Sequence, residues 1–248
     1  MSKEFGSAKE LGIFPREENL KKKWDNFNDR VTVNESQYSF GDHNVQKNFF
    51  ENLTSDKDNK EKYKFYRSEW YRRAKEFDPG NAPLAVCCEL VSTCNLGCSM
   101  CYTITDEFQD SVVGATRMLP WKIVKNVIDE CAALGVYSIL FSWRGESTLY
   151  RVRDENGEVK TFGDVIKYAN SRNILETSSL THGQLIDEKL AKILVESNLS
   201  WINYSIDGLE KEYNKIRTPR NKKNDPNFNA FSVVTQSIKT LTKVKKEL

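Results

Sequence analysis

The chain has 248 residues, an apolar content of 39% and a formal net charge of +2. This length and composition allow a sizeable core, and the near-neutral charge provides no strong field to attract nucleic acid or a membrane surface. The sequence contains no run of about 18 apolar residues, the length that would predict a transmembrane helix. Residues 1–6 lack the apolar stretch of a signal peptide. We therefore expect a cytoplasmic protein with neither nucleic-acid nor membrane partners.

Residues 1–80 are rich in charged and amide side chains and carry only scattered apolar positions. Apolar and aromatic residues recur every four positions from Tyr66, which predicts an amphipathic helix over residues 63–77. A Pro-Gly pair follows and would end this helix. We interpret residues 1–80 as a polar, mainly helical N-terminal extension and residues 81–248 as the main domain.

The main domain alternates between apolar runs typical of buried strands and amphipathic helical stretches. The predicted elements are strands at 84–91, 136–141, 174–177 and 201–206, and helices at 120–135, from Thr161, from Asp187 and at 228–248. A polar excursion before Thr161 contains Asn156-Gly157, a turn signal. The alternation indicates βαβ units and a parallel sheet. We predict an α/β fold, a partial (β/α) barrel of about four units, with a full barrel or a doubly wound sheet as the open alternatives.

Three cysteines lie close together after the first predicted strand, as Cys94-x3-Cys98-x2-Cys101. No fourth cysteine or histidine follows closely, although a structural zinc site normally has four protein ligands. In a reducing compartment this spacing indicates metal or redox chemistry rather than a disulfide framework. Three thiolates would leave one metal position open, as in metal sites that bind a substrate. The remaining cysteines fall within strand and helix patterns and are predicted core thiols: Cys87, Cys88 and Cys131.

Polar residues also follow the other three predicted strands, at residues 142–147, 178–183 and 205–208. Because the carboxyl ends of parallel strands meet at one edge of a sheet, these groups and the cysteines are expected to converge there. Turns are naturally rich in Gly, Ser and Asp, so each group taken alone is also consistent with an ordinary turn.

The cysteine spacing after a first strand resembles the signature of the radical S-adenosylmethionine (radical SAM) superfamily. The segment 144–147, Arg-Gly-Glu-Ser, resembles that family's Gly-Gly-Glu-Pro motif with Arg and Ser as departures. The segment 181–183, Thr-His-Gly, stands where many members have Thr-Asn-Gly. The segment 205–217 resembles that of members with a C-terminal SPASM or twitch extension, as does the lead-in at 69–80. The resemblance covers residues 63 to 220.

The resemblance implies a [4Fe–4S] cluster held by Cys94, Cys98 and Cys101 through three irons, with S-adenosylmethionine chelated to the fourth. It implies reductive cleavage of S-adenosylmethionine to a 5′-deoxyadenosyl radical that abstracts a hydrogen atom from the substrate. An electron donor such as ferredoxin or flavodoxin is the implied partner. The substrate is left open, with peptide or protein modification as one class, and no catalytic residue is assigned.

The resemblance also implies which residues contact S-adenosylmethionine: Gly145 and Glu146 would meet its amino group, and Met100 would lie near the adenine. The full set of implied cofactor-binding residues is Met100, Tyr102, Gly145, Glu146, Ser205 and Asp207. For these residues the competing interpretation is a turn or loop residue that packs locally. Two more residues stay open. Arg217 either pairs with the cofactor carboxylate or lies on the surface, and His182 either touches substrate or belongs to a turn.

The predicted sheet departs from the family in its extent. Four βα units are predicted, whereas the resemblance implies six. We expect either a truncated chain, which we favour, or a sheet completed by a partner. The alternative functions are a non-catalytic binding module stabilised by a metal or cluster, and a redox-sensing thiol protein.

Overall fold

The computed structural model describes residues 57–108, 110, 117–222, 225 and 227–248. Contacts divide the chain into two units, Met1–Asn52 and Leu53–Leu248, and every described residue belongs to the second. The part of the predicted N-terminal extension before residue 57 lies outside the described residues. The helix α4 (Lys57–Glu76) belongs to the second unit, whereas the sequence prediction placed a boundary after this helix.

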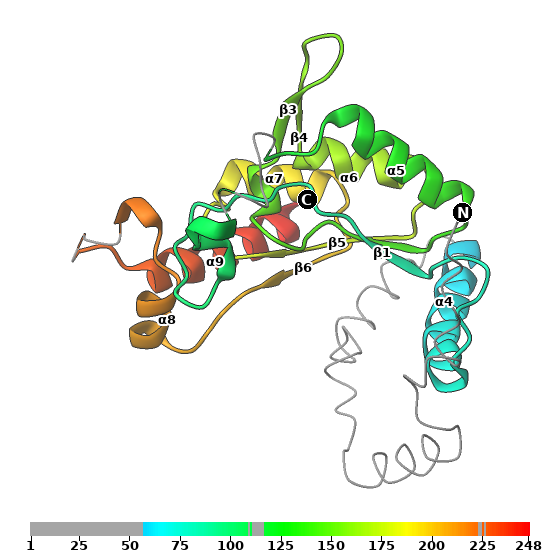
Figure 1. Cartoon of the computed structure of the whole chain (residues 1–248), viewed down its shortest axis with the longest axis horizontal. Coiled ribbons are helices and arrows are strands. Elements are labelled where there is room, and N and C mark those ends of the chain that lie inside the picture. Colours follow the sequence, from blue (N-terminus) through cyan, green and yellow to red (C-terminus); the bar gives the residue numbers. More distant parts are fainter. Residues whose placement is uncertain (1–56, 109, 111–116, 223–224, 226) are drawn as a thin grey trace, which may run out of the picture. The chain divides into compact units, whose positions relative to one another are not determined.

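Within the described residues, the second unit is built on a parallel sheet of four strands in the order β1-β2-β5-β6 (Figure 1). The strands are β1 (Ala85–Cys87), β2 (Ser138–Leu140), β5 (Glu176–Thr181) and β6 (Trp201–Tyr204). Neighbouring strands in this order pair in registers that join Ala85 to Ser138, Ser138 to Glu176 and Ser178 to Trp201. This sequential parallel order confirms the predicted α/β fold.

All four strands differ from their predicted bounds, and β2 and β6 are shorter than the predicted 136–141 and 201–206. β1 is confined to three residues of the predicted 84–91. β5 continues to Thr181, so its predicted end at Thr177 is wrong. The hydroxyl residues after Thr177 suggested a turn, yet the strand buries them, and two of the hydroxyls find partners there. Ser179 Oγ donates to the Phe141 carbonyl at 3.0 Å, and Thr181 Oγ1 donates to a carboxylate at 2.8 Å.

One face of the sheet packs against the helices α5 (Trp121–Ala133), α6 (Phe162–Ser171) and α7 (Glu188–Glu196). Ile139 of β2 and Phe141 just beyond it are fully buried in this core. The helices contribute Val124, Ile128, Val165, Ile166 and Leu194, all at most 2% exposed. These residues belong to the apolar stripes that the helical periodicity predicts, and burying them supplies the main stabilising term of the unit.

Two predicted helix starts are confirmed by their capping contacts. Thr161 and Asp164 form a capping box at the start of α6, in which the Asp164 carboxylate accepts from the Thr161 backbone N–H at 2.7 Å. Asp187 accepts from the backbone N–H of Leu190 at 2.8 Å at the start of α7. Both contacts satisfy backbone donors that the first turn of a helix leaves unpaired.

The polar excursion before α6 forms an antiparallel hairpin of β3 (Arg151–Arg153) and β4 (Val159–Thr161). Its turn occurs where predicted: Gly157 has a φ of 82°, and Asp154 accepts from the backbone N–H of Asn156 at 2.9 Å. Figure 1 shows this hairpin extending beyond α5 and α6. The hairpin therefore lies apart from the paired strands of the main sheet.

The helix α4 packs at the amino ends of the strands and confirms the helix predicted from Tyr63 onward. The Tyr66 ring stacks on Tyr137, which precedes β2, with centroids 5.5 Å apart and planes at 15°. Beside it, Ser138 Oγ donates to Glu176 Oε1 at 2.9 Å. Glu176 is 6% exposed, and burial raises the pKa of its carboxyl. This buried acid lies at the opposite end of the strands from the cysteines.

Among the described residues after β6 are the α-helices α8 (Glu210–Ile216) and α9 (Ala230–Glu247). The predicted helix at 228–248 matches α9, whereas α8 was not predicted. Tyr213 of α8 meets Phe231 of α9 edge to face, with ring centroids 5.7 Å apart. Across the part of the chain that the structure describes, no helix is long and apolar enough to cross a membrane.

Candidate functional site

The three clustered cysteines lie in the loop that follows the carboxyl end of β1. Cys98 is 7% exposed, and Cys94 and Cys101 are partly buried. Burial raises the pKa of the Cys94 thiol to about 12, and the charges of Cys98 and Cys101 act on Cys94 in the same direction. Burial also raises the pKa of Cys98. The three thiols therefore lie within electrostatic range of one another, as their spacing predicted.

The cysteine loop is paired with the segment that follows α8. Gly97 N–H donates to the Thr218 carbonyl at 3.0 Å, and Arg220 N–H donates to the Asn95 carbonyl at 3.0 Å. An isolated bridge joins Leu96 to Pro219 between these two bonds. The loop is thus bound to the chain beyond β6, a contact that sequence spacing does not reveal.

Gly145 follows β2 and packs directly on the segment between β1 and the cysteines. Its φ is 66°, and a Cβ at this position would lie 2.3 Å from the Val91 carbonyl oxygen and 2.6 Å from that of Thr93. The next residue, Glu146, donates its backbone N–H to the Thr93 carbonyl at 3.0 Å. The close approach that a glycine permits here is therefore to the chain's own backbone.

The Glu146 side chain is 2% exposed and joins the ends of β2 and β5. Its Oε1 accepts from Thr181 Oγ1 at 2.8 Å and from Thr148 Oγ1 at 2.7 Å. Its Oε2 accepts from the backbone N–H of His182 at 2.9 Å. A buried carboxylate needs such donors, and here they come from the polar groups that follow two different strands.

Arg144, which departs from the family motif, forms a two-pronged ion pair with Glu89. Arg144 Nε lies 2.6 Å from Glu89 Oε2, and Nη2 lies 2.9 Å from Oε1. This pairing raises the pKa of the guanidinium, which also lies over the Phe108 ring at 5.2 Å. Sequence reasoning missed Glu89, although an acidic residue inside the apolar run at 84–91 was a signal for such a partner.

The residues after β6 reach the same edge. Ser205 N–H donates to the Thr181 carbonyl at 2.8 Å, and Asp207 pairs with the Arg217 guanidinium. The Arg217 side chain is only 16% exposed, and its charge lowers the pKa of Cys98 against the effect of burial. The interpretation of Arg217 as a surface arginine is therefore wrong. The groups that follow all four main strands meet around the cysteine loop.

Other candidate residues lie at the margin of this cluster. Met100 and Tyr102 are each 57% exposed, and the Tyr102 ring meets Phe108 edge to face at 5.3 Å. The core placement predicted for Cys88 and Cys131 is confirmed, since each is 6% exposed. Cys87 is exposed, contrary to prediction, because it faces away from the helical layer, and its Sγ donates to the Ser142 carbonyl at 2.7 Å.

Among the residues that the structure describes, no three His, Cys, Asp or Glu side chains converge closely enough to hold a single metal ion. In an iron–sulfur cluster, by contrast, each thiolate binds a different iron. Three thiols on one loop, grouped without converging on one point, are compatible with that kind of ligation.

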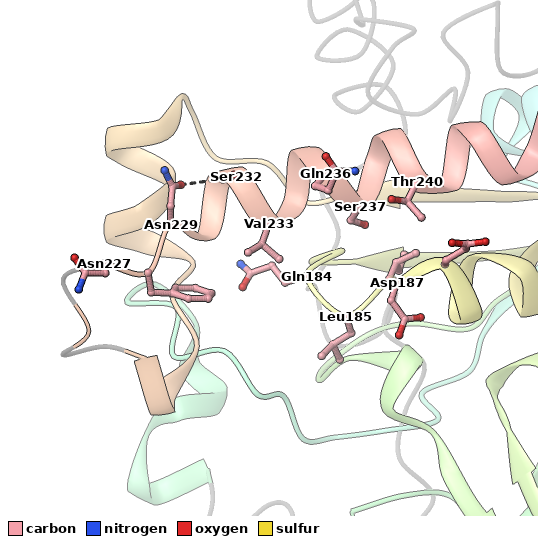
Figure 2. Close-up of a pocket in the computed structure, with 13 residues that line it drawn as sticks. Gln184, Leu185, Asp187, Asn227, Asn229, Ser232, Val233, Gln236, Ser237 and Thr240 are labelled. Carbon is pink, nitrogen blue, oxygen red and sulfur yellow. Dashed lines mark hydrogen bonds between the residues drawn. The ribbon is translucent and has the colours of Figure 1, made fainter.

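A separate cleft of about 730 Å³ opens between the start of α7 and the first half of α9 (Figure 2). Figure 2 shows Gln184 and Leu185 on one side of it, facing Val233 and Gln236 of α9. Its lining includes none of the cysteines. Gln184 nevertheless connects the two regions, because its backbone N–H donates to His182 Nδ1 at 3.0 Å.

A parallel βα sheet with three thiols and several polar groups at the carboxyl ends of its strands defines an α/β protein with a cofactor-type site. The family model of the Radical SAM superfamily matches residues 88–244, more than half of the chain. The chain belongs to this superfamily, whose members use a [4Fe–4S] cluster and S-adenosylmethionine.

Individual relatives match less completely. The chain is 30% identical over 142 residues to the Fe-coproporphyrin III synthase of Methanosarcina barkeri (strain Fusaro / DSM 804). The matched segment covers 57% of this chain and 31% of the relative. Native anSMEcpe with bound AdoMet shares the fold at 22% identity and a TM-score of 0.51, over 66% of this chain and 42% of that one. Streptococcus suis SuiB bound to S-adenosylmethionine is 18% identical with a TM-score of 0.49, over 85% of this chain and 44% of SuiB. The chain therefore spans less than half the length of each of these proteins.

Proposed function

We propose that this chain is the core of a radical SAM enzyme in which Cys94, Cys98 and Cys101 bind a [4Fe–4S] cluster that holds S-adenosylmethionine. The observation that carries the proposal is the cysteine loop, grouped at the carboxyl ends of the parallel strands and contacted by residues after each of the other three. Family membership sets the chemistry, and the loop supplies the ligands.

Cluster binding would change the protonation of the loop thiols. The raised pKa values of Cys94 and Cys98 keep both thiols protonated near neutral pH in the free chain. Iron binding would displace these protons, as it does at thiolate sites generally. When bound, the cluster and S-adenosylmethionine would supply one-electron reduction and a carbon radical that removes a hydrogen atom from the substrate. The chain's own residues would orient the reactants and limit access of water.

Contacts to S-adenosylmethionine are proposed on both sides of the loop. Met100 and Tyr102 expose more than half of their side chains and are free to touch a ligand. Glu146 Oε2 accepts from His182 N–H and lies 3.4 Å from His182 Nε2, and a carboxylate oxygen has two lone pairs, so it has capacity for a donor such as an amino group. Ser205 and Asp207 stand at the end of β6 beside Arg217 and complete the proposed set together with Gly145.

The substrate and the electron donor are also part of the proposal. A ferredoxin or flavodoxin would supply the electron. Peptide or protein modification is one substrate class to test. The similarity to an Fe-coproporphyrin III synthase makes a porphyrin a second class.

Anaerobic reconstitution with iron and sulfide tests the proposed function. The wild-type chain should take up about four irons and release 5′-deoxyadenosine after addition of a reductant and S-adenosylmethionine. Replacing Cys94, Cys98 and Cys101 with Ala should abolish both results, whereas Cys87→Ala is the matched control because this exposed thiol lies outside the loop. Equal iron uptake by the triple variant would refute the proposal. One zinc per chain without 5′-deoxyadenosine would support the non-catalytic module instead.

A further inference from the structure

His182 occupies a buried position between the end of β5 and the cysteine loop. The residue is 4% exposed. Its Nδ1 accepts from the backbone N–H of Gln184 at 3.0 Å, so the ring proton of the neutral imidazole resides on Nε2. Nε2 lies 2.8 Å from Asn95 Oδ1, which it can therefore reach as a donor. Burial lowers the pKa of His182, which favours this neutral form.

Asn95 is the residue directly after Cys94, and it is held from two directions. Its side-chain oxygen accepts from His182, and its backbone carbonyl accepts from Arg220 N–H at 3.0 Å. The Nε2–H···Oδ1 bond is the contact on the side of β5. The other hydrogen bonds that join residues 95–97 to described residues outside the loop go to the segment at 218–220.

The backbone of His182 is also held in place. Its backbone N–H donates to Glu146 Oε2 at 2.9 Å, and Glu146 also accepts from Thr181 and Thr148. The imidazole Nε2 lies 3.4 Å from the same Glu146 oxygen. A continuous chain of contacts therefore runs from the buried Glu146 carboxylate through His182 to Asn95. Such outer contacts fix the orientation of ligand-bearing residues before a metal group binds.

We propose that His182 is a positioning residue, which holds the cysteine loop in its cluster-binding conformation through the hydrogen bond from Nε2 to Asn95. This inference rests on the proposed function, since it assumes that the loop receives a cluster. It gives His182 a role that is neither contact with substrate nor membership of an ordinary turn. It also makes Asn95 the residue through which the loop is held, a role that its position between Cys94 and Cys98 in the sequence does not indicate.

Two substitutions separate the two ends of the imidazole. In His182→Gln, the side-chain amide nitrogen can stand near the position of Nε2 and donate to Asn95, while the acceptor for Gln184 N–H is lost. In His182→Asn, the side-chain oxygen can stand near the position of Nδ1 and accept from Gln184, while the donor to Asn95 is lost. Asn95→Ala removes the other partner of the same bond.

The first measurement is amide hydrogen exchange of the peptide that contains residues 94–98 in the cofactor-free chain. We expect faster exchange in His182→Asn and Asn95→Ala, and nearly wild-type exchange in His182→Gln. The second is the rate of iron release from the reconstituted chain to a chelator. Loss of an outer contact typically costs 10–100-fold in metal affinity, so His182→Asn should release iron about tenfold faster. Combining His182→Asn with Asn95→Ala should add little to either change.

The inference is overturned if His182→Asn exchanges and releases iron like wild type, if His182→Gln is as impaired as His182→Asn, or if the effects of His182→Asn and Asn95→Ala simply add. Thermal melting of each variant identifies general unfolding. If His182→Asn does not fold, the comparison of Asn95→Ala with His182→Gln decides the question. Failure of the wild-type chain to take up iron would refute the proposed function, and the exchange measurement would still test the contact.

Discussion

Gly145→Ala is expected to destabilise the protein by more than its small change in volume suggests. A non-glycine residue at a φ of 66° costs about 1–2 kcal/mol. The added Cβ would also lie 2.3 Å from the Val91 carbonyl oxygen. Because the obstructing atoms are backbone, relief requires a shift of the segment at Val91 and Thr93 or of the loop that carries Gly145, at roughly 1–3 kcal/mol. The expected total is about 2–5 kcal/mol.

Gly157→Ala is the matched control. Gly157 has a φ of 82°, and a Cβ there would meet nothing within 4 Å. This variant should therefore lose only the backbone contribution of about 1–2 kcal/mol. The difference between the two variants, about 1–3 kcal/mol, isolates the contact of Gly145 with the residues that precede Cys94.

Urea unfolding, followed by tryptophan fluorescence and circular dichroism, measures both free energies of unfolding. Hydrogen exchange around residues 91–94 should also rise in Gly145→Ala alone. If Gly145→Ala loses no more free energy than Gly157→Ala, the packing of Gly145 against Val91 and Thr93 is not rigid, and the explanation given for this glycine is incorrect.

Three further predictions concern stability. Burial raises the folded-state pKa of the Glu176 carboxyl above its ordinary value of 4.5. Well below pH 4.5 the group is protonated in both states and does not oppose folding, whereas above pH 4.5 it lowers the free energy of unfolding increasingly as the pH rises. Glu176→Gln should therefore reduce the fall of the melting temperature from acidic to neutral pH, and an unchanged pH dependence would argue against this account. Arg144→Ala leaves Glu89 without its two-pronged partner and should cost about 1–3 kcal/mol in chemical denaturation, with Arg144→Lys recovering part of the loss; wild-type stability of the Ala variant would contradict this account. Asp164→Ala removes the capping box of α6 and should lower the free energy of unfolding by about 0.5–2 kcal/mol in chemical denaturation. An unchanged free energy of unfolding would mean that the cap contributes nothing.

The helices of the core were predictable because their apolar residues repeat with the helical period, as Val124 and Ile128 do. The cysteine loop was predictable because its spacing is local in sequence. β5 was only partly predictable, since Ser179 and Thr181 carry turn-forming hydroxyls whose partners are set by the fold.

Contacts between strand ends were the least predictable part of the site. Glu89 and Arg144 meet because β1 and β2 are neighbours in a particular register, and sequence spacing carries no trace of that register. The bond between His182 and Asn95 depends in the same way on the order of β1, β2 and β5. The edge of the sheet at which the groups meet could be predicted, whereas the pairings within it could not.

The sequential order of the sheet also bears on how the chain folds. The chain separation between paired residues decreases along the sheet, from Ala85 with Ser138, to Ser138 with Glu176, to Ser178 with Trp201. Closing the longest of these loops costs roughly 0.7 kcal/mol more entropy than closing the shortest. On this basis β5 and β6 are favoured to pair early and β1 to join last. The cysteine loop lies inside the longest of these closures, so a ligand bound there would act most strongly on the final step of folding.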